Sequence, residues 1–283
     1  MNPFVQRSIK TRGLNADLFT GFFNEPQRAL IFLGGSEGGK SWNDHTEFIQ
    51  QVVGLGYVVL SLAYFGAEGL PPTLRAIPLE YFLDAFHWLS CQPGIIPGGF
   101  GLVGVSRGAE LALLLASHCP EVKAVVAIAP SSVVFPGPPT GLLDGLRGQH
   151  AAWSLNGQEM GFVPIPYTLT SLRGMLSGRR TRMFEQALLN ASAVEAAVIP
   201  VEKIQARLLL VSFTQDQIWP STRMADQVIR RLQQNDFAYP VDHQAFDTVH
   251  SNWSFATCRS SILTFLNEWL NSPGRDGPDH RFV

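Results

Sequence analysis

The sequence has few cysteines, and they are not spaced as a disulfide or zinc framework would be. Cys91, Cys119 and Cys258 are the three cysteines among 283 residues, and no two of them form a Cys-x-x-Cys pair. A sparse, odd-numbered set argues against a disulfide scaffold and against a structural zinc site. We expect three small, mostly buried apolar side chains, and nothing in the sequence indicates a metal or an organic cofactor.

Strong net charge and long apolar runs are also missing. The formal net charge is −2, and the short basic stretch 179–182 does not change this balance. Nothing in the charge therefore favours nucleic acid or an anionic membrane as a partner. The N-terminus lacks the apolar run of a signal peptide, and no segment reaches the ~18 apolar residues of a membrane span. We expect a soluble, cytoplasmic protein with a small-molecule substrate, and a homodimer is compatible with these features.

The composition is that of a chain with a large buried core. Hydrophobic residues make up 46% and charged residues 16%, which predicts one domain over residues 1–283. Apolar strands alternate with amphipathic helices, a pattern typical of an α/β fold whose mostly parallel sheet has helices on both faces. An antiparallel hairpin over 7–20 is expected at the edge of the sheet. The expected strands are 29–33, 57–63, 100–105, 122–129, 207–213 and 241–246, and the expected helices are 42–55, 78–91, 107–118, 221–233 and 253–270.

The alternation stops over residues 131–200, which contain a Pro-Gly-Pro-Pro run and no clear strand. We interpret this segment as a cap insertion over the carboxyl edge of the sheet, where ligands of open α/β sheets bind. Trp153, Phe162 and Met175 are candidates for lining a pocket there, with packing inside the cap as the competing interpretation. Residues 271–283 are polar and rich in proline and glycine, which predicts a flexible tail.

Residues 104–108 read Gly-Val-Ser-Arg-Gly, the G-x-S-x-G pattern. An apolar strand precedes Ser106 and a strong helix follows it. This context indicates a nucleophile elbow, in which the serine is held on a strained turn at a helix N-terminus whose dipole favours negative charge. The pattern predicts the α/β-hydrolase fold, with Ser106 as the nucleophile and the Arg107 amide as one oxyanion donor. A plain strand–helix turn is the competing interpretation.

Residues 34–41, Gly-Gly-Ser-Glu-Gly-Gly-Lys-Ser, support two opposing hypotheses. They match the phosphate-binding loop G-x-x-x-x-G-K-[ST] and follow a buried strand. That reading lacks the carboxylate ending a second apolar strand that would help to hold Mg²⁺, so nucleotide binding is the weaker hypothesis. As part of a hydrolase, the loop supplies the second oxyanion donor, the amide of Gly35 or of Ser36.

The order serine, acid, histidine along the chain selects the remaining catalytic residues. His250 follows the last expected strand and precedes the last helix, where the base belongs, whereas the rival His243 lies inside the strand. Asp216 follows the strand 207–213 and is expected to reach the histidine. Asp247 also lies near His250, where a local loop role is the better interpretation.

These residues resemble the C-terminal catalytic domain of the acyl-CoA thioesterase / bile acid-CoA:amino acid N-acyltransferase family. The matching segments are 62–65 with Leu70-Pro71, 79–82, 104–111, 199–202, and Asp216 with Trp219. The resemblance runs from about residue 29 to 270 and implies that the family's nucleophile, acid and base fall on Ser106, Asp216 and His250. It also implies a thioester or ester substrate.

The sequence departs from the family at several positions. Arg107 stands where lysine is common and Ala109 where glycine is common, and we expect no N-terminal β-sandwich domain. The amide-forming members use a cysteine nucleophile, so Ser106 favours hydrolysis through an acyl-serine intermediate. Acyl transfer to an amine or alcohol and a non-catalytic ligand receptor are the alternatives. A substrate carboxylate or phosphate is one conceivable partner of Arg107, and a solvated helix start is the other interpretation.

Overall fold

An eight-stranded sheet forms the centre of the computed structural model, which describes residues 4–11, 13–139, 141, 148–166, 168–250 and 255–271. The strand order is β1-β2-β4-β3-β6-β7-β10-β11. The bounds are β1 (Phe4–Thr11), β2 (Leu14–Gly21), β3 (Arg28–Leu33), β4 (Tyr57–Ala63), β6 (Phe100–Val105), β7 (Val122–Ile128), β10 (Arg207–Phe213) and β11 (Val241–Phe246). β1 and β2 form the expected antiparallel hairpin, and from β4 to β11 the neighbouring strands are parallel.

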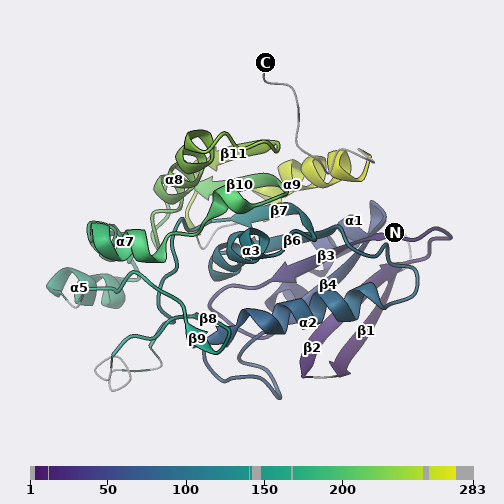
Figure 1. Ribbon diagram of the computed structural model, residues 1–283, viewed down its shortest axis with the longest axis horizontal. Coiled ribbons are helices and arrows are strands. Elements are labelled where there is room, and N and C mark those ends of the chain that lie inside the picture. The colour runs from purple at the N-terminus through teal and green to yellow at the C-terminus, as the bar shows by residue number, and fades with distance from the viewer. Residues whose placement is uncertain are drawn as a thin grey trace.

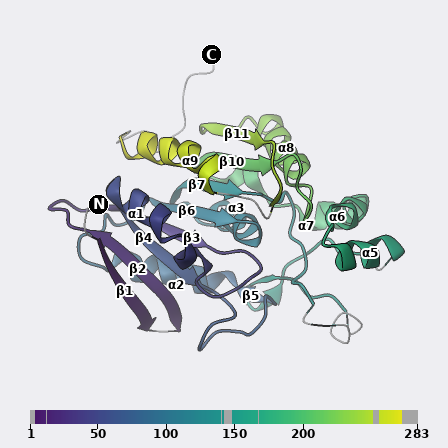
Figure 2. The same cartoon turned by 180° about the vertical axis from the view of Figure 1, so that it is seen from behind.

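The parallel strands from β4 to β10 are apolar because helices cover both faces of the sheet there, whereas the edge strand β11 is half-buried or exposed along its length. α2 (Leu79–Ser90), α3 (Arg107–His118) and α8 (Ser221–Gln234) contribute to the core on one face, and α1 (Thr46–Gly54) and α9 (Phe255–Leu270) to the core on the other. Figure 1 shows α2 and α3 in front of the sheet, and the view from behind in Figure 2 brings α1 and α9 forward. Successive residues of β10 alternate between the two cores, as a pleated strand requires. Leu208 and Leu210 belong to the core beside α3, and Leu209 and Val211 belong to the core beside α1.

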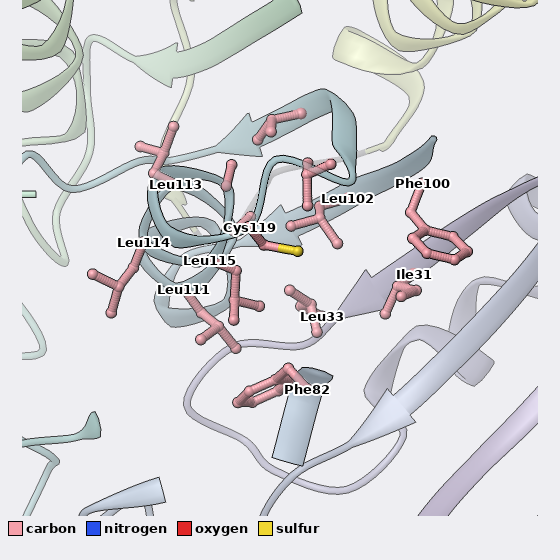
Figure 3. Packing of buried hydrophobic residues seen from close by; sticks show 14 of the residues in the cluster. Ile31, Leu33, Phe82, Phe100, Leu102, Leu111, Leu113, Leu114, Leu115 and Cys119 are labelled. Carbon is pink, nitrogen blue, oxygen red and sulfur yellow. The ribbon is translucent and has the colours of Figure 1, made fainter. Parts of the chain in front are cut away.

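Helix α3 is the most deeply buried helix of the described chain, with every residue from Arg107 to Ser117 buried. Its leucines pack among the side chains of β3 and β6, and Figure 3 shows Leu111 and Leu115 beside Leu33 and Leu102. A helix with apolar residues all round is stable only inside a core. The first turn of α3, which follows Ser106, is therefore held on a rigid support.

The expected helix over 42–55 is divided in two. A 3-10 turn, η1 (Ser41–His45), precedes α1 because His45 adopts φ −111° and ψ 38°, outside the helical region. The turn places Trp42 in the core, where its ring lies 4.6 Å from the Phe32 ring and 6.2 Å from the Phe48 ring. Because Trp42 is buried like the core residues of α1, apolar periodicity alone placed the start of the helix at residue 42, inside the 3-10 turn.

Residues 131–200 contain more regular structure than the sequence indicated. β8 (Trp153–Leu155) and β9 (Gln158–Glu159) join β5 (Ile77–Pro78) in a separate three-stranded sheet, and α5 (Leu169–Ser177), α6 (Thr181–Ala187) and α7 (Ala191–Ala197) follow. The expectation of no clear strand is wrong for β8 and β9, whose two or three residues are too short to show a period of two. In both views the three helices lie on the side to which the parallel strands point (Figures 1 and 2).

A third, smaller hydrophobic cluster lies in this segment. It joins side chains of residues 133–197 to Trp219 and Met224. The 3-10 turn η2 (Val201–Lys203) then leads the chain back to β10. Residues 272–283 of the expected tail lie outside the described residues, and no described helix has the length and apolar character needed to cross a bilayer.

Candidate active site

Ser106 lies between the end of β6 and the start of α3 with a backbone that serine rarely adopts. Its φ is 55° and its ψ is −115°, a conformation that costs free energy and persists only where the surroundings impose it. The Ser106 N–H donates to the Ile128 carbonyl at 2.8 Å, and the Ser106 carbonyl accepts from the amides of Ala109 and Glu110. The half-buried side chain is thus held at a helix N-terminus.

The two glycines of the elbow are required by close backbone approach. A Cβ on Gly104 would lie 2.1 Å from the Gly108 carbonyl oxygen, and one on Gly108 would lie 2.2 Å from the Leu33 carbonyl oxygen. No side chain fits at either position without moving the backbone. The G-x-S-x-G spacing therefore reflects the packing of α3 against β6 and β3.

Asp216 and His250 form a hydrogen bond at the carboxyl edge of the same sheet. Nδ1 of His250 lies 2.8 Å from Oδ2 of Asp216. Asp216 follows β10 and His250 follows the neighbouring parallel strand β11, so residues 34 positions apart meet. The carboxylate accepts the proton on Nδ1, which fixes the tautomer and leaves Nε2 as the basic nitrogen.

Three further donors hold the Asp216 carboxylate in place. Its Oδ1 accepts the amides of Ile218 at 2.9 Å and Trp219 at 3.2 Å, and its Oδ2 accepts the Ser221 hydroxyl at 2.6 Å. The Trp219 ring also lies edge-on to the His250 ring, 6.3 Å away. The role of Ser221 was not predictable from the sequence, because a serine at the first position of an ordinary helix carries no distinguishing signal.

The rival acid has a local role. Asp247 accepts hydrogen bonds from Thr214 at 2.7 Å and from the Gln215 side chain at 2.9 Å. These contacts join the loop after β10 to the loop after β11. Asp247 therefore acts as the local loop residue that was expected.

His243, the other candidate for the base, contacts residues other than Ser106 and Asp216. Nε2 of His243 lies 2.8 Å from the hydroxyl of Ser212, and its Nδ1 lies 3.4 Å from Asp226 on α8. Ser212 is fully buried. This trio contains the residue types of a catalytic triad, but its hydroxyl is out of reach of any substrate.

The glycine-rich loop after β3 lies directly against Ser106. A Cβ on Gly35 would lie 3.4 Å from Cβ of Ser106, whereas Ser36 is exposed. The Gly35 amide donates to the Glu37 carboxylate at 2.8 Å. Of the two residues suggested by the sequence, the structure brings Gly35 to Ser106, with its amide already engaged by an anionic oxygen.

The Arg107 side chain is turned into the protein, which contradicts both the solvated helix start and the substrate-binding role considered for it. It is buried, with Nη1 2.7 Å from Oε2 of Glu110 and Nη2 2.7 Å from the Phe135 carbonyl oxygen. The apolar surroundings of α3 make this internal pairing necessary, because an unpaired buried cation is costly. An opposite charge three residues along a helix was the available signal for it.

The phosphate-loop interpretation of residues 34–41 is not supported by the geometry. Lys40, which would reach a nucleotide phosphate, donates to Asp17 at 2.9 Å, and Asn43 donates to the same carboxylate. Burial raises the pKa of Asp17, but these hydrogen bonds outweigh it and lower the pKa overall. The loop also leads into the five-residue turn η1 rather than into the helix N-terminus that would bind phosphate.

The two described candidates for lining a pocket pack against the hydrophobic core instead. Trp153 is fully buried in the main core, Phe162 packs against that core, and the side chain of Met175 lies outside the described residues. Cys119 and Cys258 are buried as expected, but Cys91 is exposed. Within the described ranges, no three His, Cys, Asp or Glu side chains gather as a metal site would require.

Comparison with known proteins adds the family. Residues 77–247 match the family model "BAAT / Acyl-CoA thioester hydrolase C terminal". The chain is 29% identical over 282 residues to acyl-coenzyme A amino acid N-acyltransferase 2 of Rattus norvegicus, covering 96% of this chain and 61% of that protein. It is 29% identical over 240 residues to acyl-coenzyme A thioesterase 1 of Homo sapiens, covering 78% and 50%. The chain thus spans about half to three-fifths of the length of these relatives.

Solved structures agree on the fold. The Pyrococcus furiosus esterase Pf2001 matches with a TM-score of 0.60 at 17% identity, covering 95% of this chain and 94% of that one. The 2,6-dihydroxy-pseudo-oxynicotine hydrolase matches with a TM-score of 0.60 at 15% identity, covering 100% and 73%. The strand order, the strained serine turn and these likenesses establish the α/β-hydrolase fold. By its match to the family model, the chain belongs to the BAAT / acyl-CoA thioester hydrolase C-terminal family.

Proposed function

We propose that this chain is a serine acyl hydrolase that cleaves a thioester or a carboxylic ester through an acyl-Ser106 intermediate. The observation that carries the proposal is the 2.8 Å hydrogen bond between Asp216 and His250. It forms at the sheet edge where Ser106 is held in a strained turn. Nucleophilic acyl transfer requires a serine and a histidine that is oriented to act as its base.

In the proposed acylation step, Nε2 of His250 accepts the hydroxyl proton of Ser106 as Oγ attacks the acyl carbonyl. A C–O bond forms, and the carbonyl oxygen becomes an oxyanion. Asp216 stabilises the imidazolium that results. When the tetrahedral intermediate collapses, the bond to the thiol or alcohol breaks, and His250 returns the proton to the leaving group.

In the proposed deacylation step, water takes the place of the leaving group. His250 accepts a proton from the water as its oxygen attacks the acyl-serine carbonyl. The second tetrahedral intermediate collapses, the acid product leaves, and Ser106 recovers its proton. The amides of Arg107 and of the Gly35/Ser36 loop are the donors to the oxyanion in both steps, and one such donor is commonly worth about 10²–10³ in rate.

Acyl-CoA thioesters are the first substrates to test. The description of the family and the names of the relatives refer to acyl-CoA, although the chain covers only part of those proteins. The rat relative is named as an N-acyltransferase, so transfer of the acyl group to an amine is the second candidate. A serine ester is less reactive toward amines than a cysteine thioester, and this favours water as the acceptor here.

We propose that residues 131–200 form the cap of the acyl pocket. The Thr181 hydroxyl donates to the Asp216 carbonyl at 2.7 Å, and the Arg180 amide donates to the Gln217 carbonyl at 2.7 Å. The Phe135 ring lies 6.1 Å from the Trp219 ring, which in turn contacts the His250 ring. These contacts support a segment that covers the catalytic edge.

The decisive experiment combines labelling with turnover. The purified protein is treated with a fluorophosphonate probe and assayed against acyl-CoA and p-nitrophenyl esters of graded chain length, with Ser106→Ala as the control. We expect labelling of the wild type alone, and a kcat about 10⁴-fold or more lower in the variant. A folded wild type that is neither labelled nor active would refute the proposal and favour a ligand receptor. Product analysis with an amine acceptor present distinguishes hydrolysis from transfer.

A further inference from the structure

Tyr64 lies immediately after β4, and its hydroxyl faces the backbone of the oxyanion loop. Oη donates to the Gly34 carbonyl at 2.5 Å and lies 3.4 Å from the Gly35 carbonyl oxygen. The side chain is almost completely buried, and burial strongly raises the pKa of its hydroxyl. The hydroxyl therefore stays protonated at all ordinary pH values and remains a donor.

Aromatic packing leaves the Tyr64 ring little freedom. Its centroid lies 5.3 Å from that of Phe65, 5.5 Å from that of Phe82 and 5.7 Å from that of Trp153. These rings come from β4's end, from α2 and from β8. A ring contacted from three sides holds its hydroxyl at a fixed point, and so fixes the carbonyl that the hydroxyl binds.

The geometry of the peptide bond carries this constraint to the catalytic side of the loop. In a trans peptide the carbonyl of one residue and the N–H of the next point in opposite directions. The Gly34 carbonyl points to Tyr64, so the Gly35 N–H in the same plane points away from it. Ser106 lies beside the same residue, because a Cβ on Gly35 would be 3.4 Å from Cβ of Ser106.

A second observation shows that this amide accepts an anionic oxygen. The Glu37 carboxylate binds the Gly35 N–H at 2.8 Å. Its other oxygen lies 2.7 Å from the position of a Gly35 Cβ, and Ser106 Cβ lies 3.4 Å from that position. Glu37 belongs to the exposed part of the loop, so few contacts oppose its departure. A carboxylate oxygen has the charge and the hydrogen-bond preference of the oxyanion that acyl transfer creates.

We infer that Gly35 rather than Ser36 is the loop's oxyanion donor, that Tyr64 is the positioning residue that aims its amide, and that Glu37 occupies this donor in the free protein until substrate displaces it. The inference rests on the proposed function and deepens it. Glu37 then competes with the acyl carbonyl for one N–H, and its negative charge opposes the developing oxyanion. Tyr64 acts in the opposite sense, by holding the donor in the direction that the oxyanion needs.

Tyr64→Phe tests the positioning role against a matched control, Tyr57→Phe. Tyr57 begins the strand that Tyr64 follows, is fully buried, and donates its hydroxyl to the Leu266 carbonyl at 2.7 Å, at the opposite end of the sheet. Each variant therefore loses one buried hydroxyl–carbonyl bond. The readouts are kcat, KM and the inhibition constants of two compounds. One is a trifluoromethyl ketone, whose carbonyl becomes an oxyanion when Ser106 adds to it, and the other is a non-cleavable thioether analogue of the substrate.

We expect Tyr64→Phe to lower kcat and weaken trifluoromethyl ketone binding by at least about 10-fold, because a misdirected donor loses part of the 10²–10³ that one donor supplies. Binding of the thioether, which forms no oxyanion, should change less than about 3-fold. Tyr57→Phe should leave the kinetic constants and both inhibition constants close to wild type. Equal behaviour of the two tyrosine variants would overturn the positioning role.

Glu37→Ala and Glu37→Gln test whether the Glu37 carboxylate occupies the Gly35 amide. This test does not depend on Tyr64→Phe, which matters if that variant proves unstable. Removal of the competing carboxylate should raise kcat/KM and tighten trifluoromethyl ketone binding several-fold, with a smaller gain for glutamine, whose neutral oxygen still binds the amide. A loss of ketone affinity in Glu37→Ala would contradict the competition. If the wild type itself resists the fluorophosphonate, the proposed function fails; if it is labelled and these variants behave otherwise, only this inference fails.

Discussion

Glu110 accepts a 2.7 Å hydrogen bond from Nε1 of Trp153, which joins the helix that begins after Ser106 to the strand β8. The same carboxylate pairs with Arg107 at 2.7 Å and accepts the Phe135 amide at 3.3 Å. One fully buried side chain thus connects the turn at Ser106 to two parts of the segment 131–200. We interpret the cluster as the joint that fixes this segment relative to Ser106.

This joint predicts a pH-dependent stability. Burial raises the pKa of Glu110 to about 7, although Arg107 and the Trp153 hydrogen bond act in the opposite direction. The folded protein therefore keeps this proton at pH values where the unfolded chain has released it. The free energy of unfolding that the protonated Glu110 carboxyl contributes is fully present below about pH 4.5 and is lost as the pH rises through about 7. At about 1.4 kcal/mol per pKa unit, the shift from 4.5 to about 7 corresponds to a full loss of about 3–4 kcal/mol.

Glu110→Gln isolates this titration, because glutamine keeps the shape and stays neutral. Between pH 5 and pH 8 the wild type should lose stability relative to the variant, by up to about 3 kcal/mol. Urea unfolding of both proteins at the two pH values measures the difference. A constant difference across this range would mean that the carboxyl stays ionised throughout and that the ion pair with Arg107 outweighs burial.

The hydrogen bonds of Asp216 predict a graded series of kinetic effects. Asp216→Asn should lower kcat by about 10⁴-fold, because an amide at this position favours the wrong imidazole tautomer. Ser221→Ala removes one donor to Oδ2 and leaves the amides of Ile218 and Trp219 in place. It should lower kcat by only about 3- to 10-fold, since a single hydrogen bond contributes about 1 kcal/mol.

Steady-state kinetics and urea unfolding of both variants measure the series. A Ser221→Ala protein that is as inactive as Asp216→Asn, at unchanged stability, would show that the amides of Ile218 and Trp219 do not hold the carboxylate by themselves.

The two histidines that follow β10 should differ in the effect of substitution. His250→Ala removes the proposed base and should lower kcat by about 10⁴-fold or more with little change in the unfolding temperature. His243→Ala removes the contacts with Ser212 and Asp226. It should cost about 1–2 kcal/mol of stability while kcat stays within a few-fold of wild type. Steady-state kinetics together with thermal unfolding distinguish them, and the reverse pattern would exchange the two assignments.

Most elements of the fold were predictable because their signals are local. The strands 57–63, 207–213 and 241–246 agree with the structure to the residue. The first two are buried parallel strands, which are short apolar runs with polar or glycine boundaries, whereas 241–246 is a half-buried or exposed strand at the edge of the sheet. The elbow was predictable for the same reason, as strand, serine turn and helix are adjacent in the chain. The choice of Asp216 and His250 also needed only chain order and the position of each residue after its strand.

The sequence by itself determined the order of strands and helices, the serine turn and the residue types that chemistry requires, because each of these depends on neighbours within one element. Only the tertiary structure decided which partner each polar group takes. Lys40 binds Asp17 from 23 residues away, and Glu110 binds Trp153 from 43 residues away. Such pairs form because burial forces a charged or polar group to use whichever partner the packed core brings within reach, and a linear pattern does not contain that distance.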